Sequence, residues 1–159
     1  LSRLQKLIDD YNPREVLFLG DVFHSDYNSE WDLISKFCEE NADVQFSLTL
    51  GNHDVLPASI YADLGWKVHA KEVTYGALSL CHEPDENLPF AIVGHLHPGY
   101  HLKGRGKQKI LLPCFHLMPH QLLMPSFGFF TGAVPQKMTK KDIVFAIADN
   151  EVFEITHVC

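Results

Sequence analysis

The chain has 159 residues, of which 46% are apolar, and a formal net charge of −7 at pH 7. A chain of this length can bury one good core, so we expect a single domain spanning residues 1–159. No apolar run approaches the roughly 18 residues of a membrane span, and no secretory leader is present, which predicts a cytoplasmic protein without a membrane partner. The acidic balance weakens a simple case for nucleic-acid binding through a basic surface, without excluding it.

The first half of the chain predicts alternating helices and parallel strands. Apolar residues recur at helical spacing over 1–11, and Asn12-Pro13 ends this run. Buried strands are predicted over 15–19 and 44–50, and between them a helix capped by Ser29 runs to about residue 41. Because no strand precedes the helix of residues 1–11, the domain is expected to lack its first strand.

From Trp66 onward the pattern changes to short strands separated by turns. These strands are predicted over residues 67–70, 73–75, 77–81, 90–93, 100–102, 109–112, 122–125, 143–148 and 152–156. The last two flank Asp149-Asn150, a pair typical of a hairpin turn. The whole pattern predicts a mixed α/β (α+β) fold in which two β-sheets pack face to face with helices outside.

The four cysteines show no CxxC spacing, which favours free thiols in a reducing compartment over disulfides. Cys81 directly precedes a candidate site histidine, but we interpret it as a small buried residue and not as a nucleophile.

Nitrogen and oxygen donors follow four of the predicted strands. Each set would lie at the C-terminal end of its strand, where sheets of this class collect ligands. The candidate metal ligands are Asp21, Asn52, His82, His95 and His97. A carboxylate can bridge two cations, and a mixed N/O donor set suits manganese, iron, zinc or nickel better than calcium.

Two of these ligands impose a condition on this interpretation. His95 and His97 are two residues apart, and in an extended segment they would point to opposite faces. A turn at Gly94 and Pro98 is therefore required to aim both imidazoles at neighbouring ions.

Three further residues are candidates for catalysis. His53 follows the ligand Asn52, and we predict that it protonates the leaving alkoxide as general acid. Asp54 follows His53 and is expected to orient or charge its imidazole. His24 lies three residues beyond Asp21 and either contacts a substrate phosphate or plays a supporting role, two alternatives that the sequence leaves equal.

The motifs around Asp21, Asn52, His82 and His95 resemble, in order, the GDxxx, GNHD, strand-end His and GHxH motifs of the calcineurin-like metallophosphoesterase superfamily. The resemblance covers most of the chain. It implies a double β-sheet sandwich flanked by helices, two divalent metal ions with Mn²⁺ favoured (Fe, Zn, Ni or Mg as alternatives), and phosphodiester hydrolysis by a metal-activated hydroxide. It places Asp21, Asn52, His82 and His95 at one metal and Asp21 with His97 at the other.

Within the superfamily, the stretches 112–115 and 125–132 resemble the ligase-associated DNA damage response endonuclease (PdeM) branch. That resemblance implies a DNA substrate, a role in DNA repair and a DNA ligase or helicase as partner. One departure is that the DxH motif, which comes first among the superfamily's motifs, does not precede Asp21 here. We expect that the segment carrying it lies upstream of this sequence.

Two alternatives to a DNA endonuclease stay open. One is a phosphodiesterase of small nucleotide or lipid-linked substrates. The other is a non-catalytic scaffold that kept the fold and lost a metal.

Several other residues bear on these alternatives. A basic tip, formed by Lys103, Arg105, Lys107 and Lys109, is equally compatible with a grip on a nucleic-acid backbone and with a solvated turn. Phe127, Phe129 and Phe130 could stack on unpaired bases, but alternating aromatics favour a core position. Without an acidic or cysteine partner at ligand spacing, the remaining candidates are read as structural or surface histidines: His101, His116 and His120.

Overall fold

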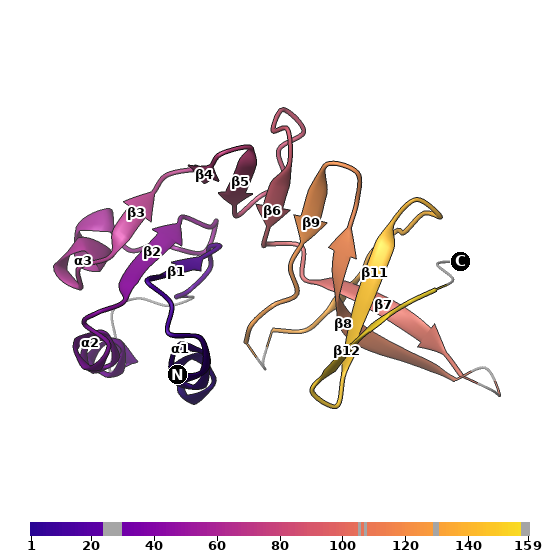
Figure 1. Cartoon of the computed structure of the whole chain (residues 1–159), viewed down its shortest axis with the longest axis horizontal. Coiled ribbons are helices and arrows are strands. Elements are labelled where there is room, and N and C mark those ends of the chain that lie inside the picture. Colours follow the sequence, from indigo (N-terminus) through magenta and orange to yellow (C-terminus); the bar gives the residue numbers. More distant parts are fainter. Residues whose placement is uncertain (24–29, 105, 107, 129–130, 157–159) are drawn as a thin grey trace. The chain divides into compact units, whose positions relative to one another are not determined.

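The computed structural model describes residues 1–23, 30–104, 106, 108–128 and 131–156 (Figure 1). The chain forms two compact units, Leu1–Lys71 and Glu72–Cys159, which are described here in turn. The predicted mixed α/β fold class is confirmed. The expectation of a single domain stays a prediction.

The first unit is a three-stranded parallel sheet with helices between its strands. Its strands, in the spatial order β1-β2-β3, are β1 (Glu15–Phe18), β2 (Gln45–Thr49) and β3 (Lys67–His69). Its helices are α1 (Ser2–Tyr11), α2 (Glu30–Glu40) and α3 (Ala58–Asp63). The alternation predicted for residues 1–50 is confirmed, whereas the short helix α3 was not predicted from the sequence.

The first helix ends where the sequence predicts. Asn12 adopts a left-handed conformation (φ 44°), and its N–H donates to the Ile8 carbonyl at 2.8 Å. Asparagine tolerates this conformation because its short polar side chain bonds locally, and the following Pro13 cannot continue the helix.

Aromatic side chains form the core of the first unit. Phe18 of β1 stacks on Trp66 with ring centroids 4.9 Å apart and planes inclined by 3°. Phe18 is partly buried, and it packs against a buried cluster that comprises Trp66 together with Ile8, Trp31, Phe37, Phe46, Leu48 and Tyr61. Each aromatic pair adds about 0.5–1.5 kcal/mol beyond burial of its area. This core fixes the strands whose C-terminal ends carry the candidate site residues.

The second unit is built on a nine-stranded mixed sheet. Its main path runs in the order β10-β7-β8-β9-β6-β5-β4, with β11 joined to β8 and β12 joined to β11. The strands are β4 (Glu72–Tyr75), β5 (Leu78–Cys81), β6 (Ala91–Val93), β7 (Pro98–Lys103), β8 (Lys109–Leu117), β9 (Gln121–Leu123), β10 (Val134–Pro135), β11 (Ile143–Ala148) and β12 (Glu151–Glu154). The hairpin between β11 and β12 is confirmed, with Asp149 and Asn150 both left-handed (φ 50° and 64°), as a two-residue hairpin turn requires.

Strand β8 is longer than the sequence predicts, and it connects most of this sheet. A proline inside a strand argues for its end, so the pattern placed the end before Pro113. In the structure Pro113 is the last β8 residue paired with β7, opposite Gly99, and Cys114 begins the pairing with β11. The missing N–H therefore falls where the strand changes partner. The two-residue strand β10 was not predicted either.

A buried hydrogen bond between a histidine and an aspartate ties the loop before β11 to β8. The His116 imidazole Nε2 lies 3.1 Å from an Asp142 carboxylate oxygen, and the two side chains are 2% and 5% exposed. Burial opposes ionisation of Asp142, but the Thr139 N–H and the His116 imidazole outweigh it and hold the pKa of Asp142 below its usual value. The ionised carboxylate thus stabilises the folded second unit.

We expect Asp142→Asn to lower the free energy of unfolding at pH 7 by about 1–3 kcal/mol, since it removes a charge-assisted hydrogen bond to a buried partner. The pKa of Asp142 is lowered in the folded state. Its contribution is therefore complete above its ordinary pKa and is lost as pH falls through the lower, folded value. Urea unfolding at pH 7 and at pH 3 measures this, and a wild-type advantage that does not shrink at pH 3 would contradict the assignment.

Candidate metal centre

The loops after β1 and β2 lie side by side at the carboxyl end of the first sheet's strands. Phe18 of β1 pairs with Leu48 of β2 in parallel register, so the segments that follow these strands leave the sheet at the same end. Gly20 and Asp21 both adopt left-handed conformations (φ 83° and 55°), which turn the chain immediately after β1. An aspartate in this conformation is uncommon, and such residues concentrate at functional sites.

The Asp54 carboxylate holds these two loops together. One of its oxygens accepts the N–H groups of Asp21 at 2.7 Å and Gly51 at 2.8 Å, and the other accepts those of Val22 at 3.0 Å and Phe23 at 3.4 Å. These four donors are all backbone N–H groups. The structure gives Asp54 a clear role in fixing the Asp21 loop, and its predicted action on the His53 imidazole stays a prediction.

Two further contacts set the position of Asp21. The His53 N–H donates to the Asp21 carboxylate at 2.9 Å. A Cβ atom placed on Gly51 would lie only 2.6 Å from the Asp21 backbone nitrogen, which real Cβ atoms essentially never do. The glycine of the Gly51-Asn52-His53-Asp54 stretch is therefore required by the close approach of the two loops.

Tyr61 of α3 is fully buried near this network. Burial, and next the charge of the Asp54 carboxylate, raise the pKa of Tyr61 to about 12. The phenol therefore stays protonated at neutral pH and adds no charge to the site.

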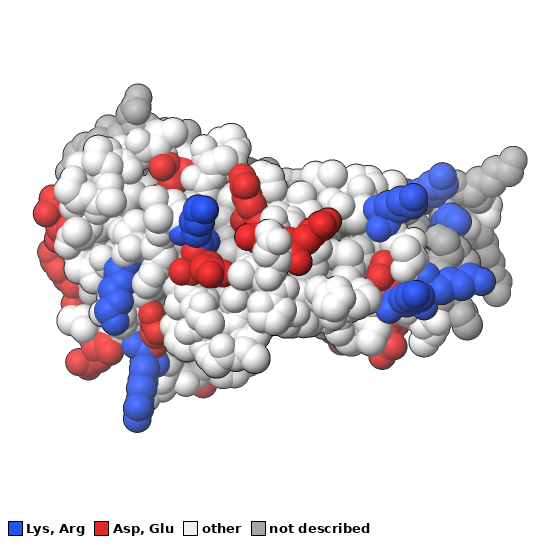
Figure 2. Space-filling view, turned by 90° about the horizontal axis from the view of Figure 1, so that it is seen from above, with Lys and Arg blue, Asp and Glu red and all other residues white. Residues whose placement is uncertain are grey.

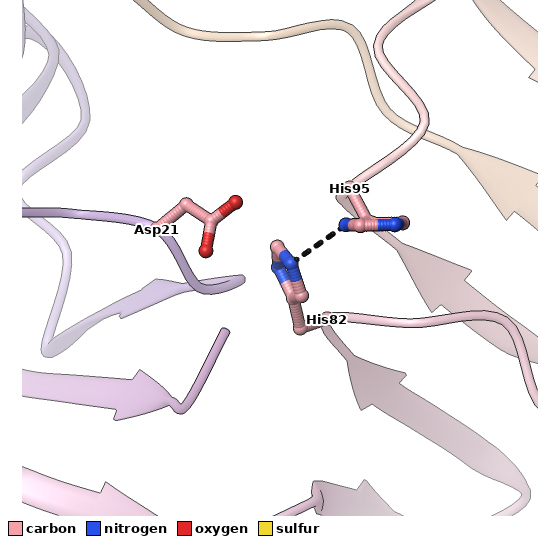
Figure 3. A group of neighbouring side chains, drawn as sticks. All are labelled: Asp21, His82 and His95. Atoms are coloured by element: carbon pink, nitrogen blue, oxygen red, sulfur yellow. Dashed lines mark hydrogen bonds between the residues drawn. The ribbon is translucent and has the colours of Figure 1, made fainter. Parts of the chain in front are cut away.

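In the second unit, two candidate ligands lie next to each other. Cys81 of β5 pairs with Val93 of β6 in parallel register, and His82 and His95 follow these strands directly. The His82 Nε2 and His95 Nδ1 atoms are 3.0 Å apart, and His82 is only 2% exposed. Figure 3 shows the two imidazoles meeting edge to face, with the dashed line joining these nitrogens; it also draws Asp21 of the first unit.

The turn required by His95 and His97 is present. Both residues are left-handed (φ 56° and 43°), and the Leu96 N–H donates to the Gly94 carbonyl at 2.6 Å between the end of β6 and the start of β7. The segment is therefore not extended, and the alternation that would point the two side chains apart does not apply. Left-handed residues other than glycine cost of order 1–3 kcal/mol, and such strain is typical of ligand sites.

The described donors fit a divalent transition metal. Two nitrogens bound to one ion at about 2.1 Å lie roughly 3 Å apart in an octahedral arrangement, which matches the His82–His95 separation. The oxygen donors that the sequence predicts for the same ion, Asp21 and Asn52, belong to the first unit, and their part in the ligand set stays a prediction. Imidazole nitrogens argue against calcium and leave manganese, iron, zinc and nickel as candidates.

The other candidates from the sequence fall into three groups. His24, Phe129 and Phe130 lie outside the described residues. The structural or surface role of the remaining histidines is confirmed, since His116 is buried against Asp142 while the other two are exposed: His101 and His120. The core position predicted for Phe127 is wrong, because its side chain is 49% exposed.

Cys81 is confirmed as a buried residue. It is 5% exposed, and its thiol donates to the Glu83 carbonyl at 3.2 Å. Burial, with smaller contributions from nearby carboxylates, raises the pKa of Cys81 to about 11, so the thiol is protonated at neutral pH and is a poor nucleophile. Cys38 and Cys114 are also free thiols, as the sequence predicts.

No protein-family model matches the chain, and no curated protein does either. Among solved structures, the crystal structure of the nuclease MPE from Pseudomonas putida matches with a TM-score of 0.82 and 22% sequence identity. The match covers 97% of this chain and 77% of the nuclease. At this identity the likeness shows a shared fold. No helix among the described residues is long and apolar enough to cross a membrane.

We expect Asp54→Asn to destabilise the first unit by about 2 kcal/mol, because an amide has one acceptor oxygen where the carboxylate accepts from four backbone N–H groups. Asp43→Asn is the matched control, since Asp43 is exposed in the same unit. Thermal unfolding followed by circular dichroism measures both variants. Equal melting temperatures for the two variants would contradict the role of Asp54.

Proposed function

We propose that the chain is a metal-dependent phosphodiesterase that cleaves DNA. Asp21, Asn52, His82 and His95 supply the ligands of one divalent metal, and Asp21 with His97 supplies ligands to a second. Mn²⁺ is the preferred metal. The observation that carries this proposal is the pair of imidazole nitrogens 3.0 Å apart at the ends of two adjacent parallel strands.

Two further findings support it. Three of the six described left-handed residues other than glycine are proposed ligands, namely Asp21, His95 and His97, which fits a site that holds them in place; the other three lie at a helix end and in a hairpin turn. In addition, the chain shares its fold with a protein described as a nuclease. A nuclease cleaves nucleic acid. As part of the proposal, we extend a substrate of this class, DNA, to this chain.

Bound divalent metals supply a nucleophile from water at neutral pH and neutralise the phosphate oxygens. The chain's own residues do the rest. Asp54 fixes the loop that presents the Asp21 carboxylate, so this ligand is preorganised. Through its N–H, His53 is tied to Asp21, and we propose that its imidazole donates a proton to the departing alkoxide oxygen.

A role in DNA repair rests on the family resemblance alone. The proposed contact between His24 and a substrate phosphate rests on the position of His24 three residues beyond Asp21, and a supporting role is its equal alternative. A DNA ligase or helicase partner has no support beyond that resemblance, and the proposal does not depend on one.

The test is hydrolysis of two substrates in the presence of Mn²⁺. Nicking of supercoiled plasmid reports cleavage of DNA, and release of p-nitrophenol from bis(p-nitrophenyl) phosphate reports phosphodiester chemistry without any need for DNA binding. We expect both, and both should stop when EDTA removes the metal. Activity on the small ester alone would favour a small-molecule phosphodiesterase, and activity on neither would favour a non-catalytic scaffold.

We expect His53→Ala to lower turnover of both substrates by about a hundredfold or more, since general acid catalysis contributes this much. Metal content, measured by atomic emission on the dialysed protein, should change little because His53 is not a proposed ligand. His120→Ala is the control, an exposed histidine of the second unit. Retained activity in the His53 variant would exclude it as the general acid.

Variants of the proposed ligands should behave differently. We expect Asp21→Ala and His82→Ala each to lose bound metal and activity together, since each removes a donor from the same ion. Isothermal titration with Mn²⁺ provides the measurement. An unchanged affinity in either variant would remove that residue from the ligand set.

A further inference from the structure

Charge is distributed unevenly along the second unit. Residues 72–159 contain seven Lys and Arg against eight Asp and Glu, so the unit as a whole is nearly neutral. All seven basic residues fall between residues 87 and 141, a stretch that contains no Asp or Glu. The net charge of −7 therefore conceals a basic region, and Figure 2 shows Lys and Arg side chains gathered at the end of the second unit.

The hairpin of β7 and β8 gives this region a defined face. Lys103 and Lys109 are direct partners across the two antiparallel strands, and both are exposed. His101 lies two residues before Lys103 on β7, which places it on the same face about 7 Å along the strand. We call these three residues the basic face of the hairpin.

Among the described residues, the two lysines of the basic face have no ion-pair partner. Like charges directly opposite each other destabilise a pair of strands. Lys103 and Lys109 form no ion pair with an acidic group among the described residues, although Lys6 and Lys36 of the first unit each have an acidic partner. An anion that binds between the two facing lysines relieves this repulsion, so the pair is a favourable place for an anion.

A hollow of about 230 Å³ adjoins the basic face. Lys103, Lys109 and His101 line it together with Tyr100, Gln136 and Met138. Its volume is roughly that of eight water molecules. The face therefore offers both charge and a recess into which an anionic group can settle.

We propose that the basic face of the β7–β8 hairpin binds the phosphate backbone of a nucleic-acid strand. This inference deepens the proposed function and rests on it, because it assigns the surface that positions a DNA substrate outside the metal ligands. Lysines that contact phosphates position the strand without reading its sequence. Binding at this face is accordingly independent of sequence and weakens as salt is raised.

An anionic membrane is the competing occupant. The opposite face of the hairpin exposes Leu102 and Ile110, which are also cross-strand partners. Two apolar side chains are a small anchor, whereas stable membrane binding combines a basic patch with a larger buried apolar surface. The hollow on the basic face, moreover, suits a strand lying along the hairpin.

The experiment measures binding in EDTA, so that neither metal nor cleavage contributes. A fluorescein-labelled single-stranded oligonucleotide is titrated with the unchanged protein and with the double variant Lys103→Gln/Lys109→Gln, and anisotropy is followed between 50 and 200 mM salt. The control is Lys67→Gln/Lys71→Gln, which removes the same charge from exposed positions of the first unit. Circular dichroism verifies that both variants fold.

We expect the hairpin variant to bind about tenfold more weakly, and the slope of log affinity against log salt to fall by about 1.4, the value for two lost phosphate contacts on a single strand. The control variant should stay within twofold of the unchanged protein. Equal affinities of the hairpin variant and the unchanged protein would overturn the inference, as would an equal loss in both variants.

Two further arms separate other outcomes. Sedimentation with vesicles of phosphatidylserine and phosphatidylcholine that depends on the same lysines, without oligonucleotide binding, would assign the face to a membrane. Displacement of the oligonucleotide by inorganic phosphate beyond that caused by matched chloride would reduce the site to a single phosphate pocket. Hydrolysis of bis(p-nitrophenyl) phosphate by the unchanged protein tests the proposed function separately, so the failure of one proposal is distinguishable from the failure of the other.

Discussion

The Asp54 carboxylate, with four backbone N–H groups around it, is the interaction on which the first half of the candidate site depends. A carboxylate accepts strong, charge-assisted hydrogen bonds, and these replace the ladder hydrogen bonds that two irregular loops cannot make. The aromatic core holds β1 and β2 in place, and the Asp54 side chain holds the loops that follow these strands. The position of Asp21 is therefore set by a charged residue that takes no part in binding metal in our proposal.

The second unit positions its candidate ligands in a different way. Its imidazoles are brought together by the parallel register of β5 and β6 and by a bend in which His95 and His97 are both left-handed. The second unit thus relies on a strained backbone, whereas the first unit relies on hydrogen bonds to the Asp54 side chain. In both cases the proposed donors are held in place by the fold itself, and such preorganisation lowers the entropy lost when a ligand binds.

Much of this arrangement could be predicted from the sequence, and the reasons for the failures are specific. Strands β1 and β2 and the helix between them follow from apolar periodicity, and the hairpin at Asp149-Asn150 follows from the chemistry of its turn. The extension of β8 past Pro113 could not be predicted, because it depends on which partner strand ends there. The bonds that Asp54 accepts from Asp21, Val22 and Phe23 were missed since they connect residues more than thirty positions apart. Exposure of Phe127 likewise depends on tertiary packing, which alternation along a segment does not report.

The pairing of strand β8 determines how readily different parts of the second unit open. The first five residues of β8, Lys109–Pro113, pair with β7, whereas Cys114–Leu117 pair with β11 and the last two of these also with β9. In native-state hydrogen exchange the amide protons of Cys114–Leu117 should therefore be among the slowest of the second unit, while those of β12, which has β11 as its neighbour in the sheet, should exchange early. Lys109 lies at the other end of the strand, where β8 pairs with β7 alone and Lys109 faces Lys103. The two ammonium groups are thus carried on a two-stranded hairpin, which can bend more readily than the part of β8 that has a neighbour on both sides and can adjust to a chain bound along it.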